Sequence, residues 1–152
     1  MSAISLQPIG VVHNEVKEPR DEDWGAIVSE IRLDPALADG LLELQHFSHA
    51  VVVFLMHEAR FDAAGHLTRH PRDREDLPLV GIFAQRARHR PNAIGITTVR
   101  IERVERGTLI VRGLDAIDGT PVLDVKPHVP AFDAPAKPRV PEWMDRLMAG
   151  YF

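Results

Sequence analysis

Two β-rich segments separated by a tight turn constrain the fold of this chain most. Residues Ile94–Val104 and Thr108–Leu114 carry the β-branched pattern of strands, and Glu105-Arg106-Gly107 lies between them. A short glycine-containing connection between two such segments predicts an antiparallel hairpin. The other strands of the chain are therefore expected to join an antiparallel sheet.

Further short strands are predicted along the chain, with little helix between them: Ile4–Val12, Ala26–Leu33, Ala50–Leu55, Val80–Ala84 and Pro121–Lys126. Asp34 is expected to cap a helical turn over residues 35–40, and a final helix is predicted from residue 141 or 142 to about residue 148. So many short strands with turn signals predict a mainly β fold, either an antiparallel barrel or a sandwich.

Two long segments are expected to cross the surface without regular structure. Residues 58–79 are charged and are interrupted by Gly65, Pro71 and Pro78, whereas residues 127–141 contain five prolines. A loop as long as the first one is more often functional than idle.

Composition excludes several classes of protein and of site. The chain has 152 residues, of which 45% are apolar and 26% charged, and this suits one domain over residues 1–152. It has no cysteine, which excludes a disulfide scaffold and a thiol nucleophile. No apolar run approaches the roughly 20 residues of a membrane helix, and no secretory signal is visible, so a cytoplasmic protein is expected. The eight histidines lack the spacing of a metal site, so no metal is expected.

Basic charge is concentrated in one part of an otherwise acidic chain. The net charge is −4, but residues 69–90 carry six arginines against three carboxylates. In an extended segment, Arg86, Arg88 and Arg90 would share one side, with His89 on the other. Guanidinium groups so close together suit an anion such as phosphate, because arginine donates in a forked pattern. The alternative is a solvated loop with ion pairs.

Three smaller groups are candidates for a ligand site. The first is the stretch Leu114–Pro121, in which Asp118-Gly119 is either an ordinary turn or part of a group of two carboxylates, Asp115 and Asp118, and a hydroxyl that holds ribose hydroxyls or an ammonium. His57-Glu58 follows a buried strand and is placed for a ligand. Trp24, between Asp23 and Gly25, either stacks on a flat ring or plugs one end of a barrel.

Two pairs near the C-terminal end have simpler interpretations. Asp124 and Lys126 share one strand face, which is typical of a surface ion pair. Tyr151 and Phe152 are expected to dock onto the body of the protein or across a subunit boundary.

Several motifs occur in one order along nearly the whole chain: Pro8-Ile9-Gly10-Val11-Val12, Phe47-Ser48-His49, Gly81-Ile82-Phe83-Ala84, Arg86, His89-Arg90-Pro91-Asn92, Ile94-Gly95, Gly113-Leu114-Asp115 and the run from Asp118 to Pro127. With this ordered set, the chain resembles the TsaA-like (TrmO) family of S-adenosylmethionine-dependent tRNA methyltransferases. The resemblance implies a small antiparallel β-barrel with short helices over residues 1–130. A proline-rich segment and a C-terminal helix would follow over residues 131–152.

The resemblance also implies an activity and its partners. The activity is N6-methylation of N6-threonylcarbamoyladenosine at position 37 of tRNA, in the anticodon loop, by a homodimer that needs no metal. The family's pattern places the S-adenosyl-L-methionine contacts at Asp23, Trp24, Gly25, His57, Glu58, Arg86, Ile117, Asp118, Gly119 and Thr120. It places substrate contacts at Arg88, Arg90, Asn92 and Lys126. Asp118 or His89 is the hypothetical proton acceptor.

The chain departs from the family's pattern at three places. Many members carry Pro-Arg-Gln after the first strand, where this chain has Asp23-Trp24-Gly25. Thr98 replaces a frequent leucine, and the proline-rich segment with one helix stands where longer members have a separate domain. Methylation of another RNA base or of a small metabolite, and a non-catalytic module that binds S-adenosylmethionine or RNA, are therefore alternative functions.

Overall fold

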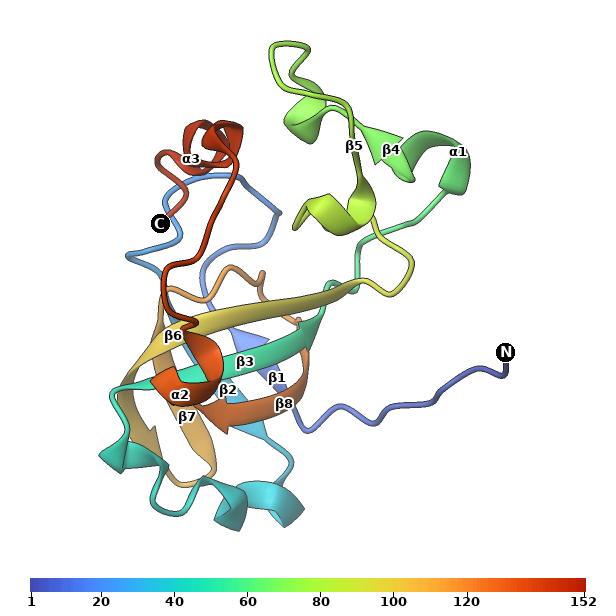
Figure 1. Cartoon of the computed structure of the whole chain (residues 1–152). Helices are drawn as coiled ribbons and strands as arrows, with labels where there is room; N and C mark the ends of the chain where they lie inside the picture. Colours follow the sequence, from blue (N-terminus) through green and yellow to red (C-terminus); the bar gives the residue numbers. More distant parts are fainter.

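The computed structural model describes residues 1–152 and contains a closed barrel of six antiparallel strands. Their order around the barrel is β1-β2-β7-β6-β3-β8 (Figure 1). The strands are β1 (Gly10–His13), β2 (Val28–Leu33), β3 (His49–Leu55), β6 (Ile94–Glu105), β7 (Thr108–Arg112) and β8 (Pro121–Pro127). The predicted antiparallel barrel is confirmed, and the predicted hairpin is β6–β7.

Alternate residues of the strands fill the interior of the barrel. In β3, Ala50, Val52 and Phe54 are buried in the core, whereas His49 and Leu55 are exposed. Inward residues of the other strands complete the core: Val12, Ile31, Val99, Leu109, Val111 and Val122. This alternation arises because successive side chains of a strand point to opposite faces.

The aromatic ring of Phe54 fits inside the barrel because Gly95 lies opposite it on β6. A Cβ atom on Gly95 would lie 2.4 Å from ring carbons of Phe54. A glycine is needed where another group approaches the backbone this closely. The pair lies near the end of the barrel where β3 ends and β6 begins, which is the upper end in Figure 1.

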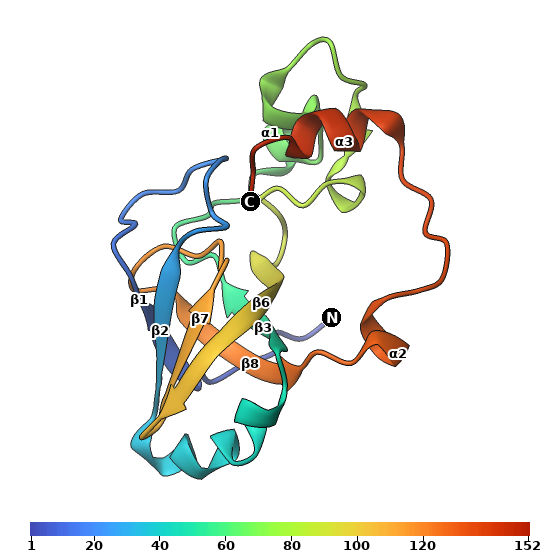
Figure 2. The same cartoon turned by 90° about the vertical axis from the view of Figure 1, so that its left-hand side faces the viewer.

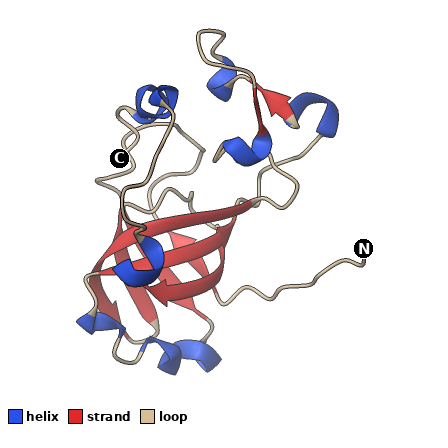
Figure 3. Cartoon of the chain, viewed as in Figure 1, coloured by secondary structure: helices blue, strands red, loops and turns tan.

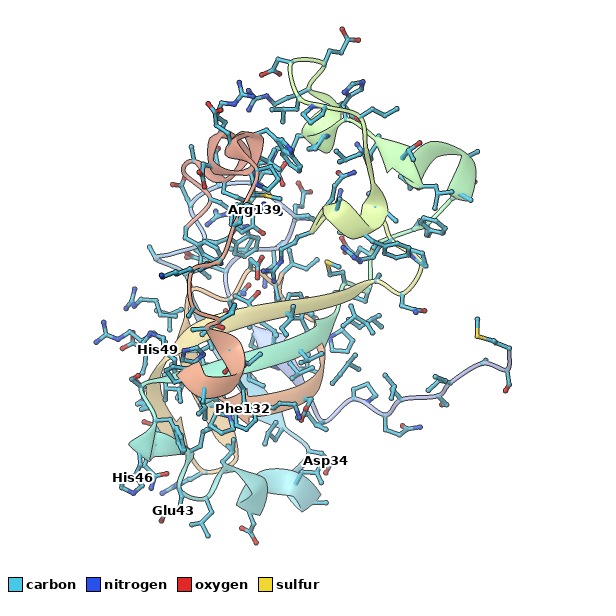
Figure 4. The ribbon with its side chains drawn as sticks, viewed as in Figure 1. Asp34, Glu43, His46, His49, Phe132 and Arg139 are labelled. Atoms are coloured by element: carbon cyan, nitrogen blue, oxygen red, sulfur yellow. The ribbon has the colours of Figure 1, made fainter.

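Two short 3₁₀ helices close the lower end of the barrel (Figure 3). They are η1 (Pro35–Leu41) and η2 (Leu44–His46), and Leu41 and Leu44 pack into the core. Asp34 caps η1 as predicted, because its Oδ1 accepts a hydrogen bond from the Ala36 amide at 2.9 Å. Figure 4 shows Asp34 at this end, together with Glu43 and His46.

Between β3 and β6 the chain forms a small layer above the upper end, here called the excursion (residues 56–93; Figure 1). Its elements are α1 (Ala63–His66), β4 (Thr68–Arg69), η3 (Pro71–Asp73), β5 (Val80–Gly81) and η4 (Ile82–Ala84). The prediction of an irregular loop over 58–79 is wrong, because β4 pairs with β5. The predicted strand Val80–Ala84 is limited to its first two residues.

The C-terminal part runs up beside the barrel and ends above it (Figure 2). It contains α2 (Pro130–Asp133), which interrupts the segment predicted to be extended, and the predicted final helix, α3 (Glu142–Met148). Residues 150–152 then dock on the loop before β2. The amides of Asp23 and Trp24 donate to the carbonyl oxygens of Gly150 and Tyr151 at 3.1 and 2.9 Å.

The N-terminal residues do not form the strand predicted from Ile4. β1 begins at Gly10, and residues 1–8 extend away from the barrel with Ile4 and Leu6 exposed (Figure 1). Pro8 has no amide hydrogen, so it cannot continue the hydrogen bonding with β8 that Ile9 begins. None of the helices is long and apolar enough to span a membrane.

Candidate functional site

A cavity of about 1400 Å³ lies at the upper end of the barrel. Phe54 and Thr97 belong to its floor, and Trp24 belongs to the side formed by the loop before β2. The excursion contributes residues that include Arg88, and α3 covers the cavity with residues that include Leu147. Pockets for one small ligand usually measure ~300–1,000 Å³, so the volume of this cavity exceeds what one small ligand needs.

The arginine segment forms one wall of the cavity, and it is not extended, so the condition for Arg86, Arg88 and Arg90 to share one side is not met. Arg90 turns back, and its Nη1 donates to the carbonyl oxygen of Gln85 at 3.0 Å. Arg86 Nη2 donates to the carbonyl oxygen of Ile96 at 2.5 Å. Arg86, Arg88 and Arg90 have no carboxylate within ion-pair distance. Their charge is therefore available to an anion in the cavity.

The bend in this segment has a local cause. Gln85 is buried at the end of η4, and its Nε2 donates to the carbonyl oxygen of Val80 at 3.1 Å. The Gln85 carbonyl remains free to accept from Arg90, which fixes the path of the chain before Pro91. Alternation of side chains along an ideal strand therefore does not apply here.

His89 is a neutral ring at the edge of the cavity. Its Nδ1 accepts from the Arg60 amide at 3.1 Å, and its ring stacks on His66 with centroids 4.9 Å apart. Partial burial, followed by the charge of Arg88, lowers the pKa of His89 below its ordinary value. The lowered pKa favours the neutral ring at pH 7, and both ring nitrogens are in contact with donors, because His89 Nε2 also lies 3.2 Å from Arg88 Nε.

His57, Glu58 and Asn92 line the cavity at the rim, where β3 ends and β6 begins. The Met56 amide donates to the carbonyl oxygen of Ala93 at 2.7 Å, which holds the two ends of the excursion together. All three side chains at the rim are exposed, so a ligand can reach them.

The predicted Asp-Gly-Thr turn is divided between the cavity and the outer surface. Ile117 and Thr120 line the cavity, whereas Asp118 and Gly119 do not. Asp118 accepts from Lys17 Nζ at 2.7 Å and from the Asn14 amide at 3.1 Å. The hydrogen bond from Lys17, followed by that from Asn14, lowers the pKa of Asp118. These contacts make Asp118 a weak proton acceptor.

Trp24 is mostly part of the apolar interior. It is 2% exposed and packs with Val16, Ile27, Ile117 and Tyr151. Its Nε1 donates to the Arg20 carbonyl oxygen at 2.9 Å, so its polar edge is already used. Its neighbours Asp23 and Gly25 lie behind it, outside the cavity lining. This placement favours the plug interpretation over an open stacking surface.

Lys126 does not line the cavity that the arginine wall borders. It is exposed on β8, outside the cavity lining, and its Nζ lies 2.7 Å from Asp124 Oδ2. The hydrogen bond that Lys126 donates to Asp124 raises the pKa of Lys126. The predicted surface pair is confirmed, whereas the structure does not bring Lys126 together with Arg88, Arg90 and Asn92. No group of three His, Asp or Glu side chains has the arrangement of a metal site.

Sequence reasoning named Asp115 as one carboxylate of a candidate ligand group but missed the polar cluster that it forms in the cavity floor. Asp115 is half-buried there and accepts hydrogen bonds from the hydroxyls of Thr97 and Tyr151 on its two carboxylate oxygens. The Tyr151 bond measures 2.5 Å. The Leu114–Pro121 group indicated Asp115, whereas no local pattern indicated its contact with Tyr151, because Tyr151 is distant along the sequence.

The sequence matches the family described as the tRNA-methyltransferase O N-terminal domain over residues 11–134. The chain belongs to this family. The resemblance inferred from the ordered motifs is thereby confirmed, and the match covers every strand of the barrel except the first residue of β1.

Individual relatives agree with this membership. A probable S-adenosyl-L-methionine-binding protein of Pyrococcus abyssi is 36% identical over 94% of this chain and 77% of its own length. A tRNA (adenine(37)-N6)-methyltransferase of Mus musculus is 41% identical over 62% of this chain and 22% of its own length. A crystal structure of TrmO from Pseudomonas aeruginosa aligns with a TM-score of 0.71 and 36% identity, covering 91% of this chain and 62% of that one. The chain thus spans only part of these relatives.

Proposed function

We propose that this chain transfers a methyl group from S-adenosyl-L-methionine to N6 of an adenine in tRNA. The acceptor we propose is N6-threonylcarbamoyladenosine at position 37. Membership of the TrmO family carries this proposal, because one relative is named as binding S-adenosyl-L-methionine and another as a tRNA (adenine(37)-N6)-methyltransferase. The volume and the arginine wall of the cavity support it, since donor and base must lie together in the reaction.

When bound, S-adenosyl-L-methionine supplies an electrophilic methyl group, and transfer breaks the sulfur–carbon bond, forms a nitrogen–carbon bond and releases the N6 proton. The protein's task is alignment and exclusion of water. Phe54, Ile117 and Leu147 provide apolar walls for this purpose. The carbamoyl group of the proposed acceptor makes the N6 proton more acidic, so a weak base within reach is sufficient.

We assign the proton-accepting role to His89 rather than to Asp118. His89 borders the cavity, and its lowered pKa favours the neutral ring that a base needs; to take the N6 proton, a ring nitrogen exchanges its contact with the Arg60 amide or with Arg88 for the substrate. Asp118 lies outside the cavity lining, and its carboxylate is occupied by Lys17.

We assign different roles to the arginines of the wall. Arg88 and Asn92 are exposed at the cavity and suit the RNA phosphates or the threonyl carboxylate. Arg90 is half-buried and bonds to the backbone, so its role is to shape the loop. The stacking platform proposed for Trp24 has less support, because the burial of this indole leaves little free ring face.

The chain is proposed to act as a cytoplasmic homodimer. Ile94 and Ile96 are 41% and 51% exposed on the outer face of β6, and both also border the cavity. A second copy seated there would bury this apolar surface and cover the cavity rim. Light scattering should give a dimer for the wild type and a monomer for Ile96→Lys. A monomeric wild type at micromolar concentration would contradict the homodimer.

The function is tested by incubating the purified protein with S-adenosyl-L-methionine and tRNA, followed by mass analysis of nucleosides. Two tRNA pools are compared, with and without threonylcarbamoylation. We expect one methyl group per modified adenosine, in the first pool only. Methylation of both pools would show another acceptor base. Binding of the donor without turnover would show a non-catalytic binding module instead.

A further inference from the structure

The floor of the cavity carries one carboxylate with no cationic partner. Asp115 accepts hydrogen bonds from Thr97 and Tyr151, but no lysine, arginine or histidine of the chain lies within ion-pair distance of it. Burial, followed by the charge of Asp115, raises the pKa of Tyr151, so its hydroxyl keeps its proton and donates. Two fixed donors hold the carboxylate in one orientation, and each of its oxygens retains a lone pair.

A guanidinium without a carboxylate partner borders the same cavity as Asp115. Arg86 donates to the carbonyl oxygen of Ile96, and the next residue, Thr97, donates to Asp115. The two opposite charges are therefore anchored to adjoining residues of β6, yet they do not pair with each other. Unpaired opposite charges that border one cavity suit a ligand that carries both signs.

We infer that Asp115 and Arg86 bind the zwitterionic α-amino-acid end of the methyl donor, with Asp115 on the ammonium and Arg86 on the carboxylate. This inference rests on the proposed function and extends it. The new assignment is that Asp115, and not Asp118, binds the ammonium, and Tyr151 is a positioning residue that acts through Asp115. The adenosine end of the donor then extends toward the apolar walls around Phe54 and Ile117.

The ammonium suits Asp115 better than the sulfonium does. The sulfonium loses its positive charge during methyl transfer, so a carboxylate against it would stabilise the reactant more than the transition state. The ammonium keeps its charge throughout the reaction. It also donates N–H bonds, for which the Asp115 oxygens have lone pairs left.

The test compares three ligands by calorimetry. S-adenosylmethionine and S-adenosylhomocysteine both carry the amino-acid end, but only the first has a sulfonium. Methylthioadenosine has neither charged group. For Asp115→Asn we expect an affinity loss of about tenfold or more for the first two ligands, in equal measure, because a charged hydrogen bond is lost. Methylthioadenosine should bind unchanged, which also shows that the variant is folded.

Two further variants sharpen the test. Asp39→Asn, an exposed carboxylate at the lower end, is the matched control and should bind all three ligands like the wild type. Tyr151→Phe keeps the ring and removes the hydroxyl. It should weaken the first two ligands less than Asp115→Asn does, and it should leave methylthioadenosine unchanged.

Other outcomes would overturn the inference. A loss confined to S-adenosylmethionine would place the sulfonium at Asp115. An equal loss for all three ligands would make Asp115 a contact of the nucleoside or a structural residue, and no loss would remove it from the site. If the wild type binds none of the three ligands, the proposed function itself fails.

Discussion

The two ends of the barrel are built from the same six strands but finished in opposite ways. At the lower end, η1 and η2 insert Leu41 and Leu44 into the core, and the interior is closed by apolar side chains. At the upper end, the excursion, the loop before β2 and α3 leave a cavity between them. Arginine, histidine and aspartate side chains line this cavity. A rigid core with one closed end can therefore support polar chemistry at the other end.

The largest effect on stability is expected at the closed end. Leu41→Ala removes a buried side chain from the core and should reduce the free energy of unfolding by ~2–5 kcal/mol, measured by urea denaturation. The same variant should bind S-adenosylmethionine with wild-type affinity under native conditions. Loss of binding by folded Leu41→Ala would show that the two ends are coupled.

Substitution of Gly95 tests its close approach to the Phe54 ring at the upper end of the barrel. Gly95→Ala brings a Cβ within 2.4 Å of the Phe54 ring and should cost ~1–3 kcal/mol by overpacking. Gly40→Ala is the matched control at the closed end, because no atom lies within 4 Å of its added Cβ. Thermal melting should separate the two variants. Equal melting temperatures would contradict the tight fit between Gly95 and Phe54.

A smaller and purely functional effect is expected at the arginine wall. Arg88→Ala should weaken tRNA binding and reduce the slope of log affinity against log salt concentration by about 1, as for one lost phosphate contact. Arg139→Ala is the control, since Arg139 is exposed, outside the cavity lining and without an ion pair (Figure 4). An unchanged slope for Arg88→Ala would exclude a phosphate contact.

The smallest effect concerns pH. Because the pKa of His89 is lowered, methyl transfer should keep its rate as the pH falls through the ordinary histidine value of about 6.5 and decline only below it. The rate falls toward acid pH because the neutral His89 ring is the active form and protonation converts it to the inactive one. His89→Gln should abolish this acid limb, whereas His46→Gln, at the closed end, should leave it unchanged. An acid limb that survives in His89→Gln would assign the base elsewhere.

Sequence reasoning located the barrel better than the excursion, for a physical reason. β3, β6 and β7 are long enough for side-chain alternation to be visible. In contrast, β4 and β5 have two residues each and exist only because they pair with each other. A segment so short has no period of its own.

In the site too, sequence reasoning found only what a local stretch of sequence can indicate. Arg86 and His89 were found because chemistry-bearing residues are concentrated in one stretch of the sequence. Asp115 and Tyr151 meet across 36 positions through a folded tail, and no local pattern can indicate that contact. Asp118 looks equally suitable in the sequence, but the fold turns it toward Lys17.

The docking of the last residues on the loop before β2 has a consequence for experiments. Two backbone hydrogen bonds at Asp23 and Trp24, and the hydroxyl of Tyr151, secure this segment, while the barrel retains its own separate ladder of bonds. Segments held by so few bonds open at a far lower free energy than a barrel core. Amide exchange at Asp23 and Trp24 should therefore be orders of magnitude faster than at Val52. A preparation can thus melt cooperatively and still contain molecules whose donor pocket is disassembled.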